Sequence, residues 1–325
     1  MDSSFDIVIV GAGIAGLLAA TEFEAAGKRV TVLEKGRGVG GRMATRRRDG
    51  AVFDHGAQFF TARDVRFRER VGAWIELGLV VPWYEYGDTG MHYRGAPSMT
   101  AVAKHLAAGL EYEVRRETLV TAVRHDGQGW ETVLGSGEIF ASQCLVLTAP
   151  VPQSLALLDA GGVAIDAASR SGLEAIRFHK CLAALAILDG PSALTAHGGS
   201  LKISDQEPVQ WIADNQRKGI SPEVPSVTIH STPAFAEAHW DSSDEERLPP
   251  LLDAAAPFLK AEVVSAQGHR WGFSQPVTAF GEDAFVDIDL GLAIAGDGLA
   301  GGRVEGAALS GLAAAGAMLG GELNR

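Results

Sequence analysis

The run DIVIVGAGIAGLLAATEFEAAGKRVTVLE, residues 6–34, decides the fold class of this chain. Its first five residues are a continuous apolar stretch rich in β-branched side chains, which is typical of a strand buried on both faces of a parallel sheet. The turn GAGIAG at 11–16 follows at once. Residues 17–26 have the composition of a helix that ends at a glycine, and residues 29–33 are a second apolar strand. This order predicts a β-α-β unit in a Rossmann-type α/β fold.

The glycine-rich turn has the spacing of a dinucleotide-binding loop. Gly11 allows the tight turn, Gly13 lets backbone N–H groups reach a pyrophosphate, and Gly16 lets the helix pack closely on the strand. The N-terminus of the helix adds partial positive charge for the phosphates. Glu34, at the end of the second strand, is placed to accept hydrogen bonds from ribose hydroxyls. The predicted dinucleotide-binding residues here are Gly11, Ala12, Gly13, Ile14, Ala15, Gly16 and Glu34.

The residues after Glu34 favour FAD over NAD as the dinucleotide. A second glycine loop, KGRGVGGRM at 35–43, stands where an NAD domain normally continues into another helix. Its Arg42 can bind a pyrophosphate through forked hydrogen bonds. The stretch FDHGAQFF at 53–60 places two small residues between polar and aromatic ones, which suits backbone that lies along a flat ring system. The predicted cofactor residues in this part are Lys35, Gly41, Arg42, Met43, His55, Gly56, Ala57 and Gln58.

The C-terminal part of the chain supplies the complementary piece of the cofactor site. Residues 292–295 (LAIA) are predicted to be a strand, and the Gly296-Asp297 pair that follows can offer its carboxylate to a ribityl hydroxyl. A helix of small residues follows and is expected to run to about Leu319. Its N-terminus, near Arg303 and Val304, can stabilise negative charge at the pyrimidine edge of a flavin. The two ends of the chain are therefore expected to fold onto one cofactor.

The composition fits a globular protein and argues against several functions. The 325 residues correspond to about two domains of roughly 150 residues each. Apolar residues make up 46% and charged residues 21% of the chain, an ordinary globular balance. The net charge of −12 argues against a general nucleic-acid binder, which needs a basic surface. The basic run RRR at 46–48 is interpreted as a solvated charged turn.

The two cysteines, Cys144 and Cys181, lie in apolar runs without a CxxC neighbour. We therefore expect buried thiols, no metal site and a reducing compartment. The few residues before the first strand include an acid and do not resemble a signal peptide, and no apolar stretch reaches the roughly 18 residues of a membrane helix. These features predict a cytoplasmic protein that binds neither nucleic acid nor membrane.

Between the two ends, the pattern predicts a second sheet. Strands are predicted at residues 80–86, 91–94, 119–124, 130–134, 138–140, 144–148, 181–188, 200–204, 208–213 and 226–231. Helices are predicted at 65–79, 98–108, 233–239 and 244–259, the last broken at two prolines. We interpret the middle as an inserted antiparallel-sheet substrate domain. The FAD-binding domain then comprises residues 1–64, 96–168 and 265–325, and the substrate domain comprises residues 65–95 and 169–264.

The GxGxxG turn, Glu34, the GGRM loop at 40–43 and Gly296-Asp297 together resemble the FAD-dependent amine oxidase superfamily. The resemblance implies an amine oxidase or p-hydroxybenzoate hydroxylase-like topology. It also implies that Val120 opens a strand whose backbone contacts adenine, and that Thr148 ends a strand near the adenosine. Classical monoamine oxidases tether FAD through a C-terminal cysteine. No cysteine follows Cys181 here, so we expect FAD to be bound non-covalently.

Three further motifs resemble the bacterial renalases: DHGAQFFT at 54–61, YRGAPSM at 93–99 and HRWGFSQP at 269–276. That resemblance implies oxidation of the 1,2- and 1,6-dihydro isomers of NAD(P) to NAD(P)+. Hydride would pass to flavin N5, and molecular oxygen would then take the electrons and give hydrogen peroxide.

Substrate-binding residues are expected beside the flavin-facing glycine. Gln58 has an amide suited to a carboxamide, Arg63 can pair with a substrate phosphate, and the aromatic residues can equally be core. The candidates are Gln58, Phe59, Phe60, Thr61, Arg63, Tyr93, Ala96, Pro97, Ser98, Trp211, His230 and Trp271. No catalytic triad, metal spacing or carboxylate pair stands out. Removing a hydride from a dihydropyridine needs no base, so no protein residue is assigned a catalytic role.

Two other functions remain open. One is a generic FAD-dependent amine oxidase or a small desaturase-like oxidoreductase, which would turn over amines and not dihydropyridines. The other is a non-catalytic flavin-binding redox sensor, for which no substrate would bleach the flavin rapidly.

Overall fold

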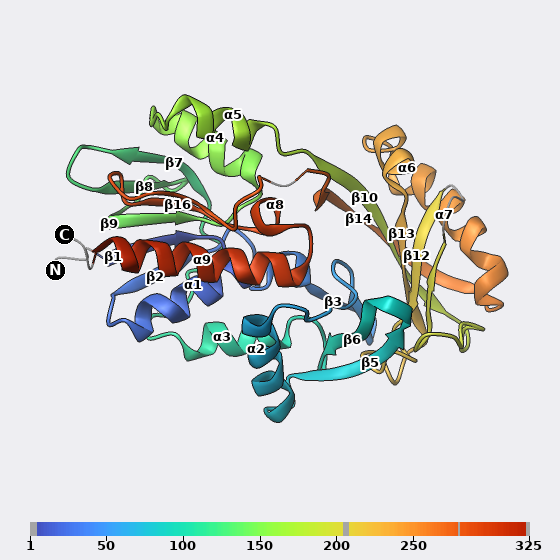
Figure 1. Ribbon diagram of the computed structural model, residues 1–325. Coiled ribbons are helices and arrows are strands. Elements are labelled where there is room, and N and C mark those ends of the chain that lie inside the picture. Colours follow the sequence, from blue (N-terminus) through green and yellow to red (C-terminus); the bar gives the residue numbers. More distant parts are fainter. Residues whose placement is uncertain (1–4, 204–207, 279, 323–325) are drawn as a thin grey trace.

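A mixed sheet with a parallel centre carries the N-terminal unit in the computed structural model, which describes residues 5–203, 208–278 and 280–322 (Figure 1). Strand β1 (Phe5–Val10) lies between β2 (Val30–Leu33) and β9 (Ile139–Leu147), parallel to both. The strand order is β15-β16-β9-β1-β2, and β8 and β7 extend the sheet from β9. The remaining strands are β7 (Val120–His125), β8 (Trp130–Leu134), β15 (Phe285–Asp287) and β16 (Leu292–Ile294). This confirms the predicted β-α-β unit.

Helices cover both faces of this sheet, as in other α/β folds. On one side, α1 (Ile14–Ala25) packs against α9 (Val304–Glu322) in one apolar core. Those two helices cross closely, since a Cβ at Gly311 would lie 2.2 Å from the Ala15 carbonyl oxygen. On the other side lies α4 (Val151–Gly161), with α5 (Ala167–Glu174) beside it (Figure 1). The short helix α8 (Asp297–Ala300) follows β16 and precedes α9.

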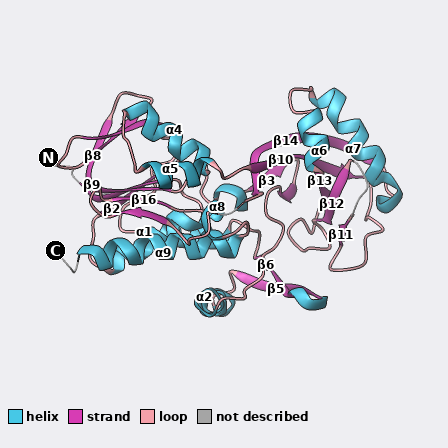
Figure 2. Cartoon of the chain, turned by 45° about the horizontal axis from the view of Figure 1, so that its top comes forward, coloured by secondary structure: helices cyan, strands magenta, loops and turns pink. Residues whose placement is uncertain are grey.

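The second sheet is antiparallel, with the strand order β11-β12-β13-β10-β14 (Figure 2). Its strands are β10 (Phe178–Leu188), β11 (Ser200–Lys202), β12 (Val209–Asp214), β13 (Ser226–Ser231) and β14 (Val263–Pro276). Helices α6 (Pro233–Ala238) and α7 (Asp244–Leu259) contribute to an apolar core on one face. The opposite face packs against Ala51 and Phe53 of the N-terminal part of the chain. The antiparallel sheet therefore faces the segment predicted to support the flavin.

Two hairpins form two further, two-stranded sheets. The pair β3 (Thr45–Arg48) and β4 (Ala51–Asp54) lies against the antiparallel sheet, and the pair β5 (Val80–Tyr86) and β6 (Gly90–Gly95) forms the hairpin predicted from the sequence. The other short elements are η1 (Gly41–Met43), α2 (Val65–Glu76), η2 (Gly87–Thr89) and α3 (Ala101–Gly109). Apolar residues of α2 and α3 belong to the same core as α1 and α9.

Several local expectations were wrong. The basic run at 46–48 does not form the predicted turn. It is part of strand β3, because its backbone pairs with β4. The two strands predicted at 138–140 and 144–148 are parts of one strand, β9 (Ile139–Leu147). Helix α7 continues through Pro249, Pro250 and Pro257, with apolar side chains buried on the sheet; this tertiary packing outweighs the local cost of proline. Strand β14 begins at Val263 and pairs with β10, so the expected domain boundary before residue 265 falls inside a strand. Residue 204, the predicted end of one strand, lies outside the described residues.

Candidate cofactor and substrate site

The first glycine turn is held by the neighbouring strand β9. Gly11 has φ +111°, a backbone conformation that favours glycine, and a Cβ there would meet the Thr148 hydroxyl at 2.6 Å. That hydroxyl lies 3.0 Å from the Val10 carbonyl oxygen and 3.1 Å from that of Gly11. A Cβ at Gly16 would lie 2.1 Å from the Gly11 oxygen, whereas one at Gly13 would meet open space. The turn is therefore tight where the helix packs and open where a pyrophosphate would approach.

Glu34 ties the first turn to the second glycine loop. Its Oε2 accepts a hydrogen bond from the Ala12 N–H at 2.9 Å, and its Oε1 accepts one from the Gly36 N–H at 2.6 Å. A carboxylate oxygen has more than one lone pair, so both oxygens keep the capacity to accept ribose hydroxyls. The Glu34 N–H in turn donates to the Arg115 carbonyl. Glu34 is thus a structural clamp as well as the candidate ribose ligand.

The second glycine loop lies directly against the first. The Gly40 N–H donates to the Ala12 carbonyl at 2.7 Å, and a Cβ at Gly41 would lie 3.5 Å from the Cα of Gly13. Arg42 then reaches the C-terminal part of the chain. Its two terminal nitrogens donate to the two carboxylate oxygens of Asp297, each at 2.6 Å. The structure therefore brings together the pyrophosphate and ribityl candidates from opposite ends of the sequence.

The residues present fit a flavin dinucleotide. Open space lies in front of Gly13, and His55 Nδ1 is buried without a hydrogen-bond partner among the described residues. An extended polar cofactor can use both features. Asp297 follows Gly296, whose N–H donates to Ser310 Oγ at 2.8 Å. Val304 begins helix α9, and Arg303 before it is exposed.

The segment that follows β4 lies beneath the antiparallel sheet. A Cβ at Gly56 would lie 2.0 Å from the Arg42 carbonyl oxygen and 3.2 Å from the Trp271 ring, so only glycine fits. The Trp271 indole N–H donates to the His55 carbonyl at 2.8 Å, and His230 Nε2 lies 3.1 Å from the same oxygen. Because a carbonyl only accepts, Nε2 of His230 carries the hydrogen. Trp271 and His230, both candidates from the sequence, therefore hold the backbone of this segment.

Three histidines gather here and stay neutral at pH 7. The His55 ring lies 4.6 Å from that of His269 and 5.1 Å from that of Trp271. Burial lowers the pKa of His55 to about 3, and the neighbouring His269 and Arg46 act in the same direction. Burial likewise lowers the pKa values of His230 and His269 to about 4. None of the three is therefore suited to act as a general base near neutral pH.

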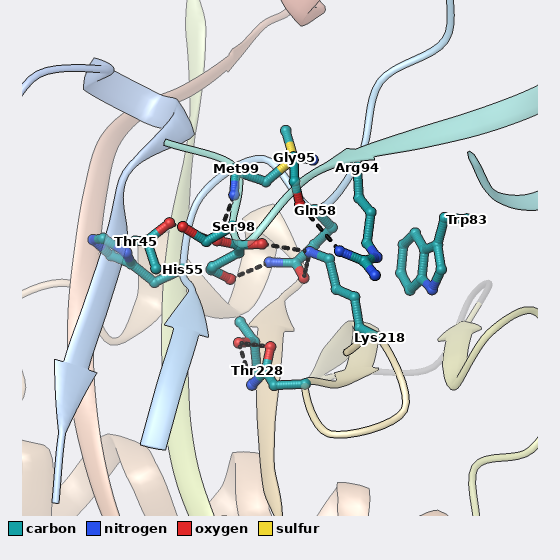
Figure 3. A network of polar contacts seen from close by, with 12 residues as sticks. Thr45, His55, Gln58, Trp83, Arg94, Gly95, Ser98, Met99, Lys218 and Thr228 are labelled. Carbon is teal, nitrogen blue, oxygen red and sulfur yellow. Dashed lines mark hydrogen bonds and ion pairs between the residues drawn. The ribbon is translucent and has the colours of Figure 1, made fainter. Parts of the chain in front are cut away.

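A buried ion pair lies next to Gln58 (Figure 3). Lys218 Nζ lies 2.9 Å from Asp54 Oδ2, and neither side chain is exposed. The same ammonium lies 3.4 Å from Gln58 Oε1. Because that oxygen faces the cation, the Gln58 amide NH₂ turns to the carbonyls of Asp54 and Gly56. Gln58 is thus committed to holding the flavin-facing segment, and its amide is not free for a substrate carboxamide.

Two of the aromatic candidates meet in one cluster. The rings of Phe59 and Trp211 lie 5.5 Å apart, and Phe59 also lies 4.3 Å from His92 and 6.3 Å from Trp83. The indole nitrogen of Trp211 is buried, and within the described part of the chain it has no hydrogen-bond partner. Burying a donor without an acceptor is costly. A ligand atom that accepts from Trp211 would remove that cost.

Other candidates lie elsewhere. Phe60 stacks with Tyr93 in the core beside α1 and α9. The Arg63 side chain is exposed, and the Arg63 backbone N–H donates a hydrogen bond to the Glu305 carboxylate of α9. The candidates that are buried or partly buried without a place in the aromatic cluster are Met43, Thr61, Ala96, Ser98 and Val120. Pro97 is exposed, and the exposed Lys35 donates to Gln153.

A cavity of about 310 Å³ opens at the end of strands β10 and β14. It is lined by His179, Lys180, Cys181, Gln210, Pro233, Ser274, Gln275, Pro276 and Val277. None of these residues was a candidate from the sequence. The cavity adjoins the cofactor region, since Arg42 donates to the Phe273 carbonyl and a Cβ at Gly302 would lie 2.7 Å from the Pro276 ring. Burial raises the pKa of the Cys181 thiol to about 12, so this cysteine is unreactive.

Sequence reasoning missed Asp54, Trp83, Arg94 and Lys218. Asp54 carried a signal, because an acid at the end of an apolar strand needs a partner when the strand is buried. Lys218 carried none, because it follows the polar run DNQR and looks like part of a solvated loop.

Comparison with known proteins first concerns the N-terminal unit. Residues 9–70 match the family model of an NAD(P)-binding Rossmann-like domain. The sequence is 46% identical over 59 residues to 4,4'-diapophytoene desaturase (4,4'-diaponeurosporene-forming) of Staphylococcus haemolyticus, and 42% identical over 59 residues to that of Staphylococcus aureus strain Newman. Each match spans 18% of this chain and only 12% of the desaturase. This chain therefore covers only a small part of the length of the desaturases that it matches.

Solved structures resemble nearly the whole chain. A triple mutant of putrescine oxidase superposes with a TM-score of 0.74 at 16% identity, over 98% of this chain and 99% of that one. A proposed protoporphyrinogen oxidase from Exiguobacterium sp. 255-15 gives 0.71 at 17% identity, over 100% of both chains. The chain has the fold of the FAD-dependent amine oxidases. This confirms the predicted fold class. The predicted cofactor, FAD, fits this fold.

Two negative findings complete the description. Within residues 5–203, 208–278 and 280–322, no helix is both long and apolar enough to cross a membrane. Over the same residues, no group of three or more His, Cys, Asp or Glu side chains is placed to hold a metal ion.

Proposed function

We propose that this chain is an FAD-dependent oxidase of the 1,2- and 1,6-dihydro isomers of NAD(P), as its resemblance to the bacterial renalases implies. The fold and the Rossmann-like match support an FAD-dependent oxidoreductase. The dihydropyridine substrate rests on the three sequence motifs and on one structural observation, the absence of a poised base.

That observation concerns the groups around Gly56. In the described part of the chain, the titratable side chains around this segment include three neutral histidines, His55, His230 and His269, and the ion pair of Asp54 with Lys218. His230 already uses Nε2 on the His55 carbonyl. A dihydropyridine gives up hydride with the help of its own ring nitrogen and needs no proton removed. An amine must first be deprotonated. A site without a poised base therefore suits the dihydropyridine better.

When bound, FAD supplies the chemistry: it accepts the hydride at N5 and returns the electrons to O2, which gives H2O2. The protein's task is then binding and orientation. Glu34, Arg42 and Asp297 are proposed to hold the ribose, pyrophosphate and ribityl groups. The rings of Phe59 and Trp211 are proposed to orient the planar substrate.

A generic amine oxidase or small desaturase-like oxidoreductase is the second candidate. The likeness to putrescine oxidase over nearly the whole chain and the sequence match to a desaturase favour it. If this second candidate is the function, the cavity beside Lys180 is the proposed substrate site.

Anaerobic stopped-flow reduction of the holoenzyme distinguishes these functions. The panel contains 1,2- and 1,6-dihydro-NAD(P), ordinary 1,4-dihydro-NAD(P), putrescine and a longer amine, followed at the flavin absorbance. We expect rapid bleaching by the first two only, with a rate nearly independent of pH from 6 to 9. His230→Ala is expected to weaken substrate binding more than it slows reduction, and His105→Ala, an exposed control on α3, is expected to change neither.

Bleaching by an amine alone would transfer the assignment to the second candidate. A hundred-fold loss of reduction rate in His230→Ala, together with a steep pH profile, would overturn the base-free mechanism; it corresponds to about 2.7 kcal/mol on the barrier. No rapid bleaching by any member of the panel would favour the redox sensor.

A further inference from the structure

The charges around Asp54 do not cancel. Asp54 Oδ2 faces Lys218, and Oδ1 accepts hydrogen bonds from the Thr45 hydroxyl at 2.6 Å and the Met99 N–H at 3.1 Å (Figure 3). Both oxygens of this buried carboxylate are therefore engaged. Arg94 brings a second cation to the same network. One carboxylate thus faces two cations, and the balance is one positive charge.

Arg94 is the cation without a carboxylate partner. Its Nη1 donates to the Gly95 carbonyl at 3.1 Å, and no described Asp or Glu lies within ion-pair distance of its guanidinium. A guanidinium has five N–H donors, so most of them remain available. Burial lowers the pKa of Arg94 while the Asp54 charge opposes this, yet an arginine stays protonated in a protein. A partly buried, under-paired guanidinium is costly unless an anion joins it.

The surroundings of Arg94 suit a ligand that combines a flat ring with an anion. Figure 3 shows Arg94, Lys218 and Trp83 on the same side of the polar network, and the Lys218 ammonium lies 5.1 Å from the centre of the Trp83 ring. Phe59 lies near Trp83 on one side and near Trp211 on the other. Trp211 presents its unpartnered indole N–H within the same cluster. Aromatic faces, a bare donor and an uncompensated cation are therefore gathered between hairpin β5–β6 and the antiparallel sheet.

We propose that Arg94 is a specificity residue that binds a phosphate group of the substrate. The identity of the substrate rests on the proposed function, because a dihydro-NAD(P) isomer carries a pyrophosphate beside its planar ring. The expectation that Arg94 binds an anion rests only on the excess positive charge of the network around Asp54. Arg94 suits the task because its fork of N–H donors matches phosphate oxygens, whereas Lys218 is already neutralised by Asp54.

The first experiment measures anion binding without turnover. Inorganic pyrophosphate is titrated into oxidised holoenzyme by calorimetry at fixed ionic strength. We expect wild-type protein to bind it, Arg94→Met to bind at least tenfold more weakly, and Arg94→Lys to fall between them. Arg217→Met is the matched control, because Arg217 is one residue from Lys218, half-exposed and close to Asp214. This control is expected to bind pyrophosphate as the wild type does. Equal weakening in Arg94→Met and Arg217→Met, or no binding by wild type, would overturn the proposal.

The second experiment separates phosphate recognition from a structural role. Steady-state oxidation of dihydro-NAD isomers is compared with oxidation of the matching dihydronicotinamide riboside, which has no phosphate. We expect Arg94→Met to raise KM for the dinucleotide about tenfold, with kcat and the riboside KM within twofold of wild type. Equal losses with both substrates would show that Arg94 only maintains the fold and would overturn the proposal. If neither compound is oxidised, the proposed function fails, and the pyrophosphate titration still decides the role of Arg94.

Discussion

Arg42 and Asp297 are 255 residues apart in the sequence, and they form a bidentate ion pair with both N–O distances at 2.6 Å. The pair joins η1 to the first residue of α8, the short helix that follows β16. Arg42 also donates to the Phe273 carbonyl of the antiparallel sheet and lies over the Phe178 ring. One guanidinium therefore connects both sheets at the point where the FAD phosphates and ribityl chain are expected.

Arg42→Met is expected to weaken FAD binding by about 10- to 100-fold, because charge-assisted hydrogen bonds contribute about 1.5–3 kcal/mol each. The measurement is the Kd for FAD, from fluorescence quenching on reconstitution of the apoprotein. Arg116→Met, which removes an exposed arginine paired with Glu113, is the control and should leave the Kd unchanged. An unaltered Kd in Arg42→Met would remove Arg42 from the cofactor site.

Glu34→Ala is expected to lower both FAD affinity and the stability of the apoprotein. The carboxylate accepts two backbone N–H groups of the glycine loops, so its loss should cost about 1–3 kcal/mol even without cofactor. Urea unfolding of the apoprotein and FAD titration measure the two effects separately. Glu34→Gln keeps an acceptor and should retain part of each. If affinity stayed at the wild-type value while stability fell, Glu34 would be a clamp for the loops and no ribose ligand.

FAD is expected to leave the protein on acid precipitation. Cys144 and Cys181 are the chain's only cysteines; no cysteine lies in the C-terminal part that could form a thioether like that of classical monoamine oxidases. The measurement is the flavin absorbance of the supernatant and of the washed pellet after trichloroacetic acid treatment. A yellow pellet would contradict the prediction.

The Asp54–Lys218 pair is expected to behave as a unit. Lys218→Met removes the direct ion-pair partner of a fully buried carboxylate and should destabilise the protein by about 3–5 kcal/mol. The double variant Asp54→Asn with Lys218→Met removes both charges and should lose less than the sum of the single variants. Urea unfolding at pH 7.5 completes the double-mutant cycle, and Arg217→Met is the control. Strict additivity would mean that the two groups do not interact.

Stability is expected to fall as the pH is lowered from 6.5 to 5. Folding holds the pKa values of His55, His230 and His269 at about 3 to 4, below the usual 6.5. In this window the unfolded chain binds more protons than the folded one, so acid favours unfolding. The slope is at most about 1.4 kcal/mol per pH unit for each histidine. Urea unfolding across the window should show a shallower slope for His269→Asn, whereas the exposed His105→Asn should keep the wild-type slope.

The β-α-β unit was predictable because its signals are local. Apolar continuity marks a buried strand, glycine spacing marks the turn, and an acid at a strand end needs no information from elsewhere in the chain. The hairpin of β5 and β6 was visible for the same reason. The unbroken α7 was not, because packing of Leu248 and Leu251 on the antiparallel sheet holds a helix that proline would locally disfavour.

By itself, the sequence determined the Rossmann-type unit, the placement of the two glycine loops and the FAD-type pairing of an N-terminal and a C-terminal segment. Only the tertiary structure decided which charges meet. Asp54 takes Lys218 from a loop of the other sheet and leaves Arg94 unpaired, and Phe59 joins Trp83 and Trp211 rather than the core that holds Phe60. Such contacts leave no periodic pattern in a sequence, because the partners lie on separate elements and the energy that selects them comes from burial. Exclusion from water makes an unpaired charge costly, and only the folded chain determines where water is excluded.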